Sequence, residues 1–312
     1  MEHKKKGIIR FIIILMILLV GICVALGIMG IISRGENSLL HDSKSQLELE
    51  NADYKSRVES LQNQVEELQE TVEQKNKEIE DLKTQLEEMK RIDISELEPG
   101  TIIELEDIKD YTDEFFRQYE IQKGDSVHER IYGKSYRDNN NIGLEDLKYL
   151  KMIHYNFEHE IQVGEMIVNA DISDDVLNIF KELFAIEYEV ESMYLIDNYW
   201  TGDGGTSDTA SIEENNTSAF CYRVITGGGN LSNHAYGRAI DINPQQNPYV
   251  YLSGGEWRWS HENATPYIDR DCGDPHVIVK GDACYSIFEK YGFSWGGNWS
   301  NPLDYQHFEK ES

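Results

Sequence analysis

The chain has 312 residues, and its 29 basic and 57 acidic residues give a formal net charge of −28. Such an acidic chain lacks the basic footprint of a nucleic-acid-binding protein, and its 40% hydrophobic and 11% aromatic content excludes global disorder. Aromatic residues are unevenly spread, because all five tryptophans lie at or after Trp200 and the first 92 residues contain only Tyr54 after Phe11. The sequence therefore predicts about two units, a low-aromatic stalk and a globular C-terminal part.

Residues 7–32 are almost wholly apolar, and the stretch Phe11–Ile32 contains no charged residue. A membrane-spanning helix needs ~20 such residues, whereas the apolar core of a cleaved secretory signal has only ~7–15. Lysines and an arginine precede or open the run, so the positive-inside rule places the N-terminus in the cytoplasm. The pattern predicts that residues 1–35 form a basic tip and a single-pass membrane anchor, with the rest of the chain extracellular. The alternative, a buried core helix, has no apolar partner nearby.

Residues 36–98 carry a heptad pattern that no glycine or proline interrupts. Apolar residues occupy most of its a and d positions: Val58, Leu61, Val65, Leu68, Val72, Ile79, Leu82, Leu86 and Met89. The polar Asn51 and Lys75 break the seam, and the flanking positions are rich in Glu, Gln and Lys. The pattern predicts a coiled-coil stalk that forms a homo-oligomer, with a single solvated helix as the alternative. Pro99-Gly100 ends the pattern, so residues 99–312 are expected to form the globular domain.

In the middle of the chain, helical periodicity is clearest after Ser173, which is expected to cap a helix. Apolar residues then recur at helical spacing and predict a core-facing stripe: Val176, Ile179, Phe180, Leu183 and Phe184. A shorter helix is expected to start at Thr112 and to carry Phe115, Phe116 and Tyr119.

Two other segments of this region have no strong periodicity. Residues 193–197 suit a short strand, and the glycine-containing polar segment 200–216 is expected to be a surface loop rather than part of a site. His154 and His159 are five residues apart and so do not share a helix face. Together with His128 they are interpreted as structural or solvent-exposed histidines.

The first segment that carries chemistry is Ser232-Asn-His234-Ala-Tyr-Gly237-Arg-Ala239-Ile-Asp241-Ile-Asn243. If residues 239–243 form a strand, the two isoleucines face the core and Asp241 faces the other way. Gly237 allows a tight reversal that brings His234 back over that face. Imidazole and carboxylate are both good zinc ligands, but an isolated pair of this kind is more often a hydrogen-bonded structural pair.

A second segment, Asp304-Tyr-Gln-His307-Phe308-Glu309, supplies the other half of a site. A strand over 305–309 puts His307 on one face and leaves Asp304 nearby, at the end of the preceding turn. A zinc hydrolase typically has three protein ligands and an open position for water, and His234, Asp241 and His307 supply that number. Asp304 is then the candidate that takes the proton from the metal-bound water and passes it to the leaving amine. Other divalent metals accept the same ligand types.

The patterns S-x-H-x-x-G-x-A-x-D and D-x-x-H together resemble the zinc peptidases that include VanY-type D-alanyl-D-alanine carboxypeptidases and the L-alanyl-D-glutamate endopeptidases of phage lysins. The similarity covers roughly residues 220–310, and a Trp-Gly-Gly segment at Trp295 is also similar to that family. The resemblance implies an α+β fold, with a small antiparallel sheet and packed helices. It also implies zinc ligands at His234, Asp241 and His307 and a catalytic base at Asp304.

The family has a further arginine upstream of the first motif, and here that arginine is Arg223. In a peptidase it would hold the substrate's carboxylate or stabilise the tetrahedral oxyanion, whereas a plain surface charge is the alternative. Ser232 is expected either to hydrogen-bond at the site or to be a turn residue. Trp295 and Trp299 either wall the cleft and contact the substrate or pack in the core.

The substrate implied by the resemblance is a peptidoglycan stem peptide. The family's carboxypeptidases usually carry Glu at the position of Asp304 and its endopeptidases usually carry Asp, which favours cleavage between L-Ala and D-Glu over removal of a terminal D-Ala. The anchor and the stalk suit a resident enzyme that acts on the cell's own wall. Two alternatives stay open, a non-catalytic coiled-coil scaffold of the cell wall and an anchored peptidase whose substrate is a protein.

The extracellular cysteines, Cys221, Cys272 and Cys284, are expected to meet an oxidising environment. Cys284 lies on an apolar helical stripe and should be buried, and a Cys272–Cys284 disulfide stays open. Nothing in the sequence activates a thiol, and neither S-x-x-K nor H-E-x-x-H occurs, which argues against a thiol hydrolase, a serine D,D-peptidase and a zincin. His261 and His276 have no partner at ligand spacing and are not expected to bind metal.

Overall fold

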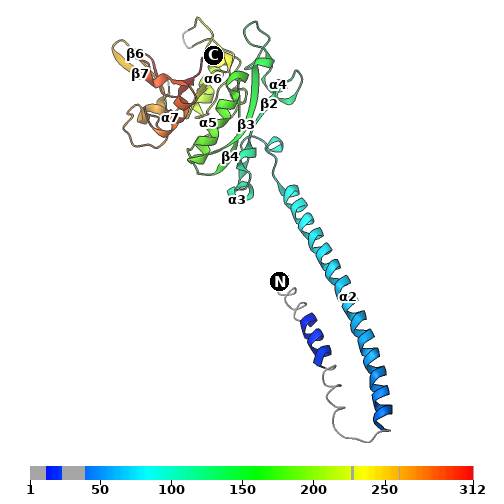
Figure 1. The fold of residues 1–312 in the computed structure, drawn as a ribbon. Coiled ribbons are helices and arrows are strands. Elements are labelled where there is room, and N and C mark those ends of the chain that lie inside the picture. The colour runs from blue at the N-terminus through cyan, green and yellow to red at the C-terminus, as the bar shows by residue number, and fades with distance from the viewer. Residues whose placement is uncertain (1–11, 23–38, 226–227, 260, 312) are drawn as a thin grey trace. The chain divides into compact units, whose positions relative to one another are not determined.

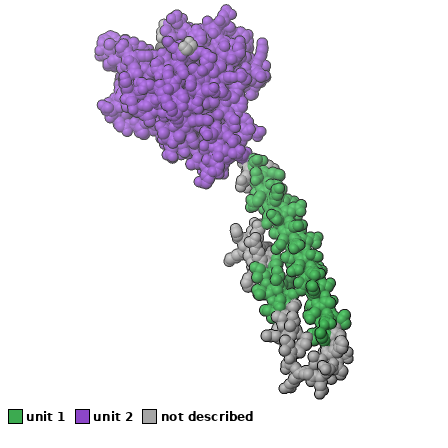
Figure 2. All heavy atoms as spheres, viewed as in Figure 1, with its two compact units in different colours: residues 1–90 green, residues 91–312 purple. Residues whose placement is uncertain are grey.

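The computed structural model describes residues 12–22, 39–225, 228–259 and 261–311 (Figure 1). The chain divides into two compact units, residues 1–90 and residues 91–312 (Figure 2). The division falls at the end of a long helix. The domain boundaries that the sequence places at residues 35 and 98 stay predictions.

The first unit is helical where it is described, with residues 12–22 in one helix and α2 (Leu39–Lys90) in another of 52 residues. Within the described ranges, no helix has both the length and the hydropathy that crossing a membrane requires. Most of the anchor predicted over residues 1–35 lies outside the described residues.

The helix α2 runs without a break through residues 39–90 of the heptad segment predicted over 36–98. Ion pairs one turn apart, such as Lys75–Glu78, contribute only a few tenths of a kcal/mol each on so exposed a helix. Several seam residues are exposed in the single chain, among them Leu68 at 60% and Leu82 at 55%. The helix is thus confirmed, and its pairing into a coiled coil stays a prediction.

The second unit mixes helices with antiparallel sheets, which confirms the predicted α+β class. Its largest sheet has the strand order β1-β4-β3-β2, formed by β1 (Ile102–Ile103), β2 (Phe116–Glu120), β3 (Leu147–Tyr155) and β4 (Ile161–Asn169). A second sheet, β5-β10-β8, is formed by β5 (Ala239–Asp241), β8 (Ser294–Trp295) and β10 (His307–Glu309). The third, β7-β6-β9, consists of β6 (Tyr249–Ser253), β7 (Glu256–Trp259) and β9 (Leu303–Asp304), and its first two strands form a hairpin (Figure 1).

Helices cover and connect these sheets. They are α3 (Leu105–Ile108), α4 (Ser126–Ile131), α5 (Ser173–Ala185), α6 (Gly204–Glu213) and α7 (Ala283–Lys290). Short 3-10 turns occur at η1 (Ile94–Glu96), η2 (Thr112–Phe115), η3 (Leu144–Asp146), η4 (Ala170–Ile172), η5 (Ile196–Tyr199), η6 (Asn233–Tyr236), η7 (Glu262–Tyr267) and η8 (Gly296–Asn298). Of the α-helices, α5 packs against β2, β3 and α7.

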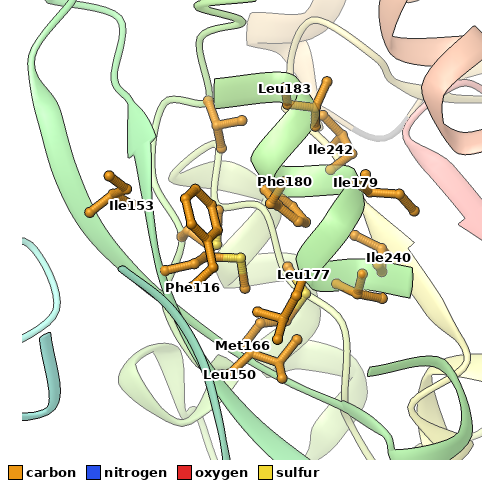
Figure 3. Packing of buried hydrophobic residues seen from close by; sticks show 14 of the residues in the cluster. Phe116, Leu150, Ile153, Met166, Leu177, Ile179, Phe180, Leu183, Ile240 and Ile242 are labelled. Atoms are coloured by element: carbon orange, nitrogen blue, oxygen red, sulfur yellow. The ribbon is translucent and has the colours of Figure 1, made fainter. Parts of the chain in front are cut away.

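The core of the second unit is built around α5. Its predicted apolar stripe is confirmed, because Val176, Ile179, Phe180 and Leu183 are buried and Phe184 packs against them. Figure 3 shows α5 between the strand residues of the large sheet on one side and Ile240 and Ile242 on the other. These two isoleucines hold β5 in the core and so fix which way its intervening residue faces.

Two sequence predictions in the middle of the chain are wrong because strand pairing overrides the local pattern. The turn that starts at Thr112 is a single 3-10 turn, η2, and Phe116 and Tyr119 then lie in β2. Pairing of Phe116 with Met152 in β3 extends this segment. Residues 193–197 form no strand but an irregular stretch that leads into η5.

A smaller difference concerns Ser173, which is the first residue of α5 rather than its cap. Its hydroxyl donates hydrogen bonds to Ala170 and to the side chain of Gln118, so it ties the helix start to β2.

The described cysteines, Cys221, Cys272 and Cys284, are free thiols, so no Cys272–Cys284 disulfide forms. Cys284 is buried, as predicted, and Cys272 is exposed. Burial raises the pKa of both Cys221 and Cys284 well above the usual value of a thiol. Neither buried thiol is therefore an activated nucleophile.

His154 has the structural role predicted from the sequence, because it is buried in β3 and its Nδ1 hydrogen-bonds to the carbonyl of Tyr155 at 3.2 Å. Burial lowers the pKa of His154 to about 4. The unfolded chain, with a histidine pKa near ~6.5, therefore binds more protons than the folded chain between these two values.

We expect the free energy of unfolding to fall as the pH drops from about 6.5 to about 4, by about 3 kcal/mol at most from His154. In His154→Asn this loss should be smaller, because the amide keeps the hydrogen-bond donor and does not titrate. Urea unfolding at several pH values measures the slope. Gln122→Asn, a substitution of an exposed side chain that does not titrate, is the control and should keep the wild-type slope. Equal slopes in the wild type and His154→Asn would contradict this account.

Candidate functional site

The pairing of β5 with β10 brings two of the candidate metal ligands together. The strands are antiparallel, with His307 opposite Asp241 and Phe308 opposite Ile240. Residues directly opposite each other lie on the same face with Cβ atoms ~4.5–5.5 Å apart. Since Ile240 and Phe308 are buried in the core, Asp241 and His307 share the other face. His307 Nδ1 lies 3.1 Å from Asp241 Oδ1.

The third candidate ligand, His234, lies on the 3-10 turn η6. Ser232 caps this turn, because its hydroxyl oxygen accepts a hydrogen bond from the backbone N–H of His234 at 3.3 Å. Gly237 ends the turn with φ at 64°, and a Cβ there would lie 2.6 Å from the backbone nitrogen of Asn169. The turn therefore needs glycine for both its conformation and its close approach to β4.

Hydrogen bonds decide which nitrogen of each neutral imidazole carries the proton. His234 Nδ1 donates to the carbonyl of Ala219 at 2.6 Å, and His307 Nε2 donates to Glu309 Oε2 at 3.0 Å. When both rings are neutral, each turns its unprotonated nitrogen towards Asp241. The ligand atoms of the three buried residues all lie within 4.8 Å of one another. Two lone pairs and a carboxylate converging out of water are unfavourable unless a cation lies between them.

The pKa shifts of His307 and Asp241 also show that this group of residues is stabilised by positive charge. Burial opposes the charged form of His307, but hydrogen bonds to Asp241 and Glu309 outweigh it and raise the pKa of His307 to about 10. Burial would also raise the pKa of Asp241, but His234 and His307 hold that pKa well below its usual range. A divalent metal ion supplies positive charge in place of protons. His234, Asp241 and His307 therefore fit a metal ion.

Glu309 is a functional residue that sequence reasoning missed. It accepts the Nε2 proton of His307 and also a hydrogen bond from Asn233 Nδ2 at 2.6 Å. Such an outer carboxylate orients a ligating imidazole and raises its basicity. The sequence could have indicated this contact, because residues two apart on a strand, such as His307 and Glu309, lie on the same face.

Asp304, the candidate base, lies at the end of β9 opposite Tyr249 of β6. Its side chain is only 8% exposed, and Oδ1 has no hydrogen-bond partner among the described residues. Burial raises the pKa of Asp304 to about 7, with His307 opposing and Asp241 adding to the shift. A carboxyl group that titrates near neutral pH is suited to accept a proton and return it.

The tight turn at η8 supports this carboxyl group from behind. A Cβ on Gly296 would lie 2.6 Å from the carbonyl oxygen of Asp304 and 3.3 Å from the Cβ of His307. The first glycine of the Trp-Gly-Gly segment is thus required by close packing behind the site.

A cavity of about 540 Å³ opens over these groups. Its lining includes the three candidate ligands and Asp304, together with Arg223, Ser232, Tyr249, His261 and Trp299. A volume of this size falls in the range of ligand-binding pockets. The cavity is therefore large enough to take part of a peptide.

The two tryptophans expected at the cleft have different positions. Trp299 lines the cavity, and its ring centroid lies 5.4 Å from that of His307. Trp295 is placed in the core instead, 5% exposed, with its Nε1 donating to the carbonyl of Tyr305. The physical reason is register, because Trp295 lies opposite Phe308 and so shares its core-facing side. Trp295 is a packing residue.

Arg223 lines the cavity and forms an ion pair with Asp208 of α6. The distance between Arg223 Nη2 and Asp208 Oδ2 is 2.8 Å, and each side chain is 11% exposed. The prediction of a surface loop over 200–216 is wrong, because Asp203 caps α6 and this helix forms part of the cavity wall. The apolar residues of segment 204–213 have too weak a period to predict this helix from the sequence. No sequence motif indicated a role for Asp208.

The other histidines outside the motifs lie apart from the candidate metal ligands. His261 lines the cavity but does not join the converging group. His276 lies between Asp274 and Glu189, at 2.9 and 2.8 Å. His128 accepts a hydrogen bond from a backbone N–H in a turn.

An α+β fold with a buried His-Asp-His group and a neighbouring carboxyl in one cavity is typical of metal-dependent hydrolases. Residues 226–310 match the family model described as D-alanyl-D-alanine carboxypeptidase, and this match supports the VanY-type family and a peptidase activity. The matched segment contains all three candidate ligands and Asp304, whereas Arg223 precedes it. Neither the curated proteins nor the solved structures that were compared gave a match to the chain.

We expect Glu309→Ala to weaken the binding of a divalent metal about 10- to 100-fold, because His307 loses the acceptor that orients its ring. Titration of the full-length chain with Zn²⁺ in competition with a chromophoric chelator measures the affinity. Glu311→Ala removes a nearby exposed carboxylate and should leave the affinity unchanged. Equal affinities in Glu309→Ala and the wild type would refute the role of Glu309.

Proposed function

We propose that this chain is a zinc metallopeptidase that hydrolyses peptidoglycan stem peptides between L-Ala and D-Glu. The observation that carries the proposal is the convergence of His234, Asp241 and His307 beside Asp304 in one cavity. Two imidazoles and a carboxylate with room for water are the donor set of catalytic zinc sites. The family match over residues 226–310 supports the same activity.

Each residue of the cavity has a defined chemical task in this proposal. A zinc ion on the three ligands would polarise the scissile carbonyl and lower the pKa of a bound water. Asp304 accepts the proton of that water and donates it to the leaving amine. Arg223 faces the developing negative charge on the carbonyl oxygen. Trp299 walls the cleft beside His307, and Ser232 holds the turn that positions His234.

Removal of a terminal D-Ala is the second candidate reaction. The description of the matching family, D-alanyl-D-alanine carboxypeptidase, favours it. The aspartate at position 304 favours the endopeptidase, because the carboxypeptidases that the motifs resemble usually carry Glu there. The complete set of ligands and base argues against a scaffold that binds wall peptides without cutting them.

We also propose that the chain is held at the cell membrane as a homo-oligomer, with its N-terminus in the cytoplasm and the peptidase unit outside. The uncharged run Phe11–Ile32 and the basic residues before it support the anchor. The exposed seam of α2 supports self-association, since burying its apolar residues in a second copy is favourable.

We expect Asp304→Asn to lower kcat by about 10² to 10⁴, because the amide cannot accept the proton of the attacking water. Zinc affinity should change little. The full-length chain is incubated with purified stem peptides, and the products are identified by mass spectrometry. A fragment beginning at D-Glu identifies the endopeptidase, and loss of a terminal D-Ala identifies the carboxypeptidase.

Removal of zinc with a chelator should abolish the same cleavage, and added Zn²⁺ should restore it. Full activity in the metal-free protein would refute the metallopeptidase. No cleavage of either bond by the zinc-loaded protein would favour the scaffold.

We expect Val72→Lys to reduce the oligomer mass, because it places a charge at an a position of the seam. Sedimentation equilibrium of the full-length chain in density-matched detergent measures the mass. Glu70→Lys changes a flanking exposed position of the same helix and should leave the oligomer intact. A wild-type chain that sediments as a monomer would contradict the proposed coiled coil.

A further inference from the structure

The cationic side chain of the cavity is already paired in the structure. Among the described residues that line the cavity, Arg223 is the only lysine or arginine. Its Nη2 lies 2.8 Å from Asp208 Oδ2, and both side chains are only 11% exposed. Because the pair is largely buried, solvent only weakly screens the attraction between the two charges. The two side chains therefore present no net charge to a ligand.

The rest of the cavity adds negative rather than positive charge. Asp241, Asp304 and Glu309 also line it. Burial lowers the pKa of His261, so this histidine adds no positive charge at neutral pH. A divalent metal ion would offset two of the negative charges. Its coordination positions would be filled by its own ligands and by the reacting groups. No unpaired cation among the described lining residues is left to hold a free carboxylate.

Arg223 can still act on a neutral group. Its Nε is buried and has no hydrogen-bond partner among the described residues. This N–H lacks the acceptor that a buried donor needs, and Asp208 is paired with Nη2 of the same guanidinium group. The same aspartate offers an acceptor oxygen for an amide N–H but repels a carboxylate.

The difference between a carboxylate and a neutral amide applies directly to the substrate of the proposed reaction. In a stem peptide, D-Glu continues the chain through its side-chain carboxyl, so its α-carboxyl group stays next to the nitrogen of the scissile bond. That group is either a free carboxylate or, when amidated, a neutral carboxamide. The carboxylate would approach a pair that already contains Asp208, whereas the carboxamide can hydrogen-bond to both members of the pair.

We propose that Asp208 is a specificity-determining residue that directs the site to stem peptides whose D-Glu α-carboxyl group is amidated. Its ion pair with Arg223 removes the charge that would bind a carboxylate and presents an acceptor to a carboxamide. The proposal rests on the proposed function and extends it by naming the form of the substrate.

The test compares two synthetic peptides, L-Ala-D-Glu-L-Lys joined through the side chain of D-Glu and the same peptide with an α-carboxamide. Calorimetry with the full-length zinc-loaded chain measures binding, and mass spectrometry measures cleavage. The wild type should bind and cleave the carboxamide peptide at least about tenfold better than the carboxylate peptide. Asp208→Asn should lose or reverse this preference, because Arg223 is then an unpaired cation.

Two variants serve as controls. Asp208→Glu keeps the charge and should retain the preference, which separates the effect of charge from a loss of folding. Glu214→Gln removes an exposed charge just after α6 and should leave the preference unchanged. Thermal unfolding of each variant shows whether it is folded.

The outcomes separate this inference from the proposed function. Preferential binding of the carboxamide peptide without cleavage would support the role of Asp208 and refute the peptidase. Cleavage of both peptides at equal rates, or tighter binding of the carboxylate peptide, would refute the role of Asp208 and leave the peptidase standing. No measurable binding of either peptide would overturn both.

Discussion

The antiparallel pairing of β5 with β10 is the constraint on which the site depends. These strands are only three residues long, yet their register places His307 opposite Asp241 and Phe308 opposite Ile240. A shift by one residue would turn the apolar pair to the cavity and the polar pair to the core. Burial of Ile240 and Phe308 against α5 and α7 therefore fixes the register, and the register fixes the candidate metal ligands.

The polar groups around this pair have an arrangement that fits a bound cation. Hydrogen bonds from His234 to Ala219 and from His307 to Glu309 turn the second nitrogen of each ring towards Asp241. Asp304 Oδ1 and Arg223 Nε are buried in the same cavity without partners among the described residues. Buried polar atoms without partners are costly, so a ligand that supplied contacts to these two atoms would be favoured here.

The parts of the fold that the sequence predicted well are those with a strong local period. Regular spacing of apolar residues predicted three elements: the stripe of α5, the long helix α2 and the strand that carries Asp241. In each of them, helix or strand geometry places the regularly spaced residues on one face. The predictions failed where a distant partner decided the conformation. Phe116 and Tyr119 are in a strand because β3 pairs with them, and the helix α6 has too few apolar residues to be seen in the sequence.

The sequence by itself determined the candidate ligands and the base, because His234, Asp241, Asp304 and His307 belong to two short segments whose internal spacing already implies shared faces. The same alternation also places Glu309 on the face of His307, although sequence reasoning missed its role. Only the tertiary structure decided which other side chains reach the cavity. It moved Trp295 into the core through its register with Phe308, and it joined Asp208 to Arg223 from separate elements. Such contacts depend on how elements pack, and the spacing of residues along one segment carries no information about them.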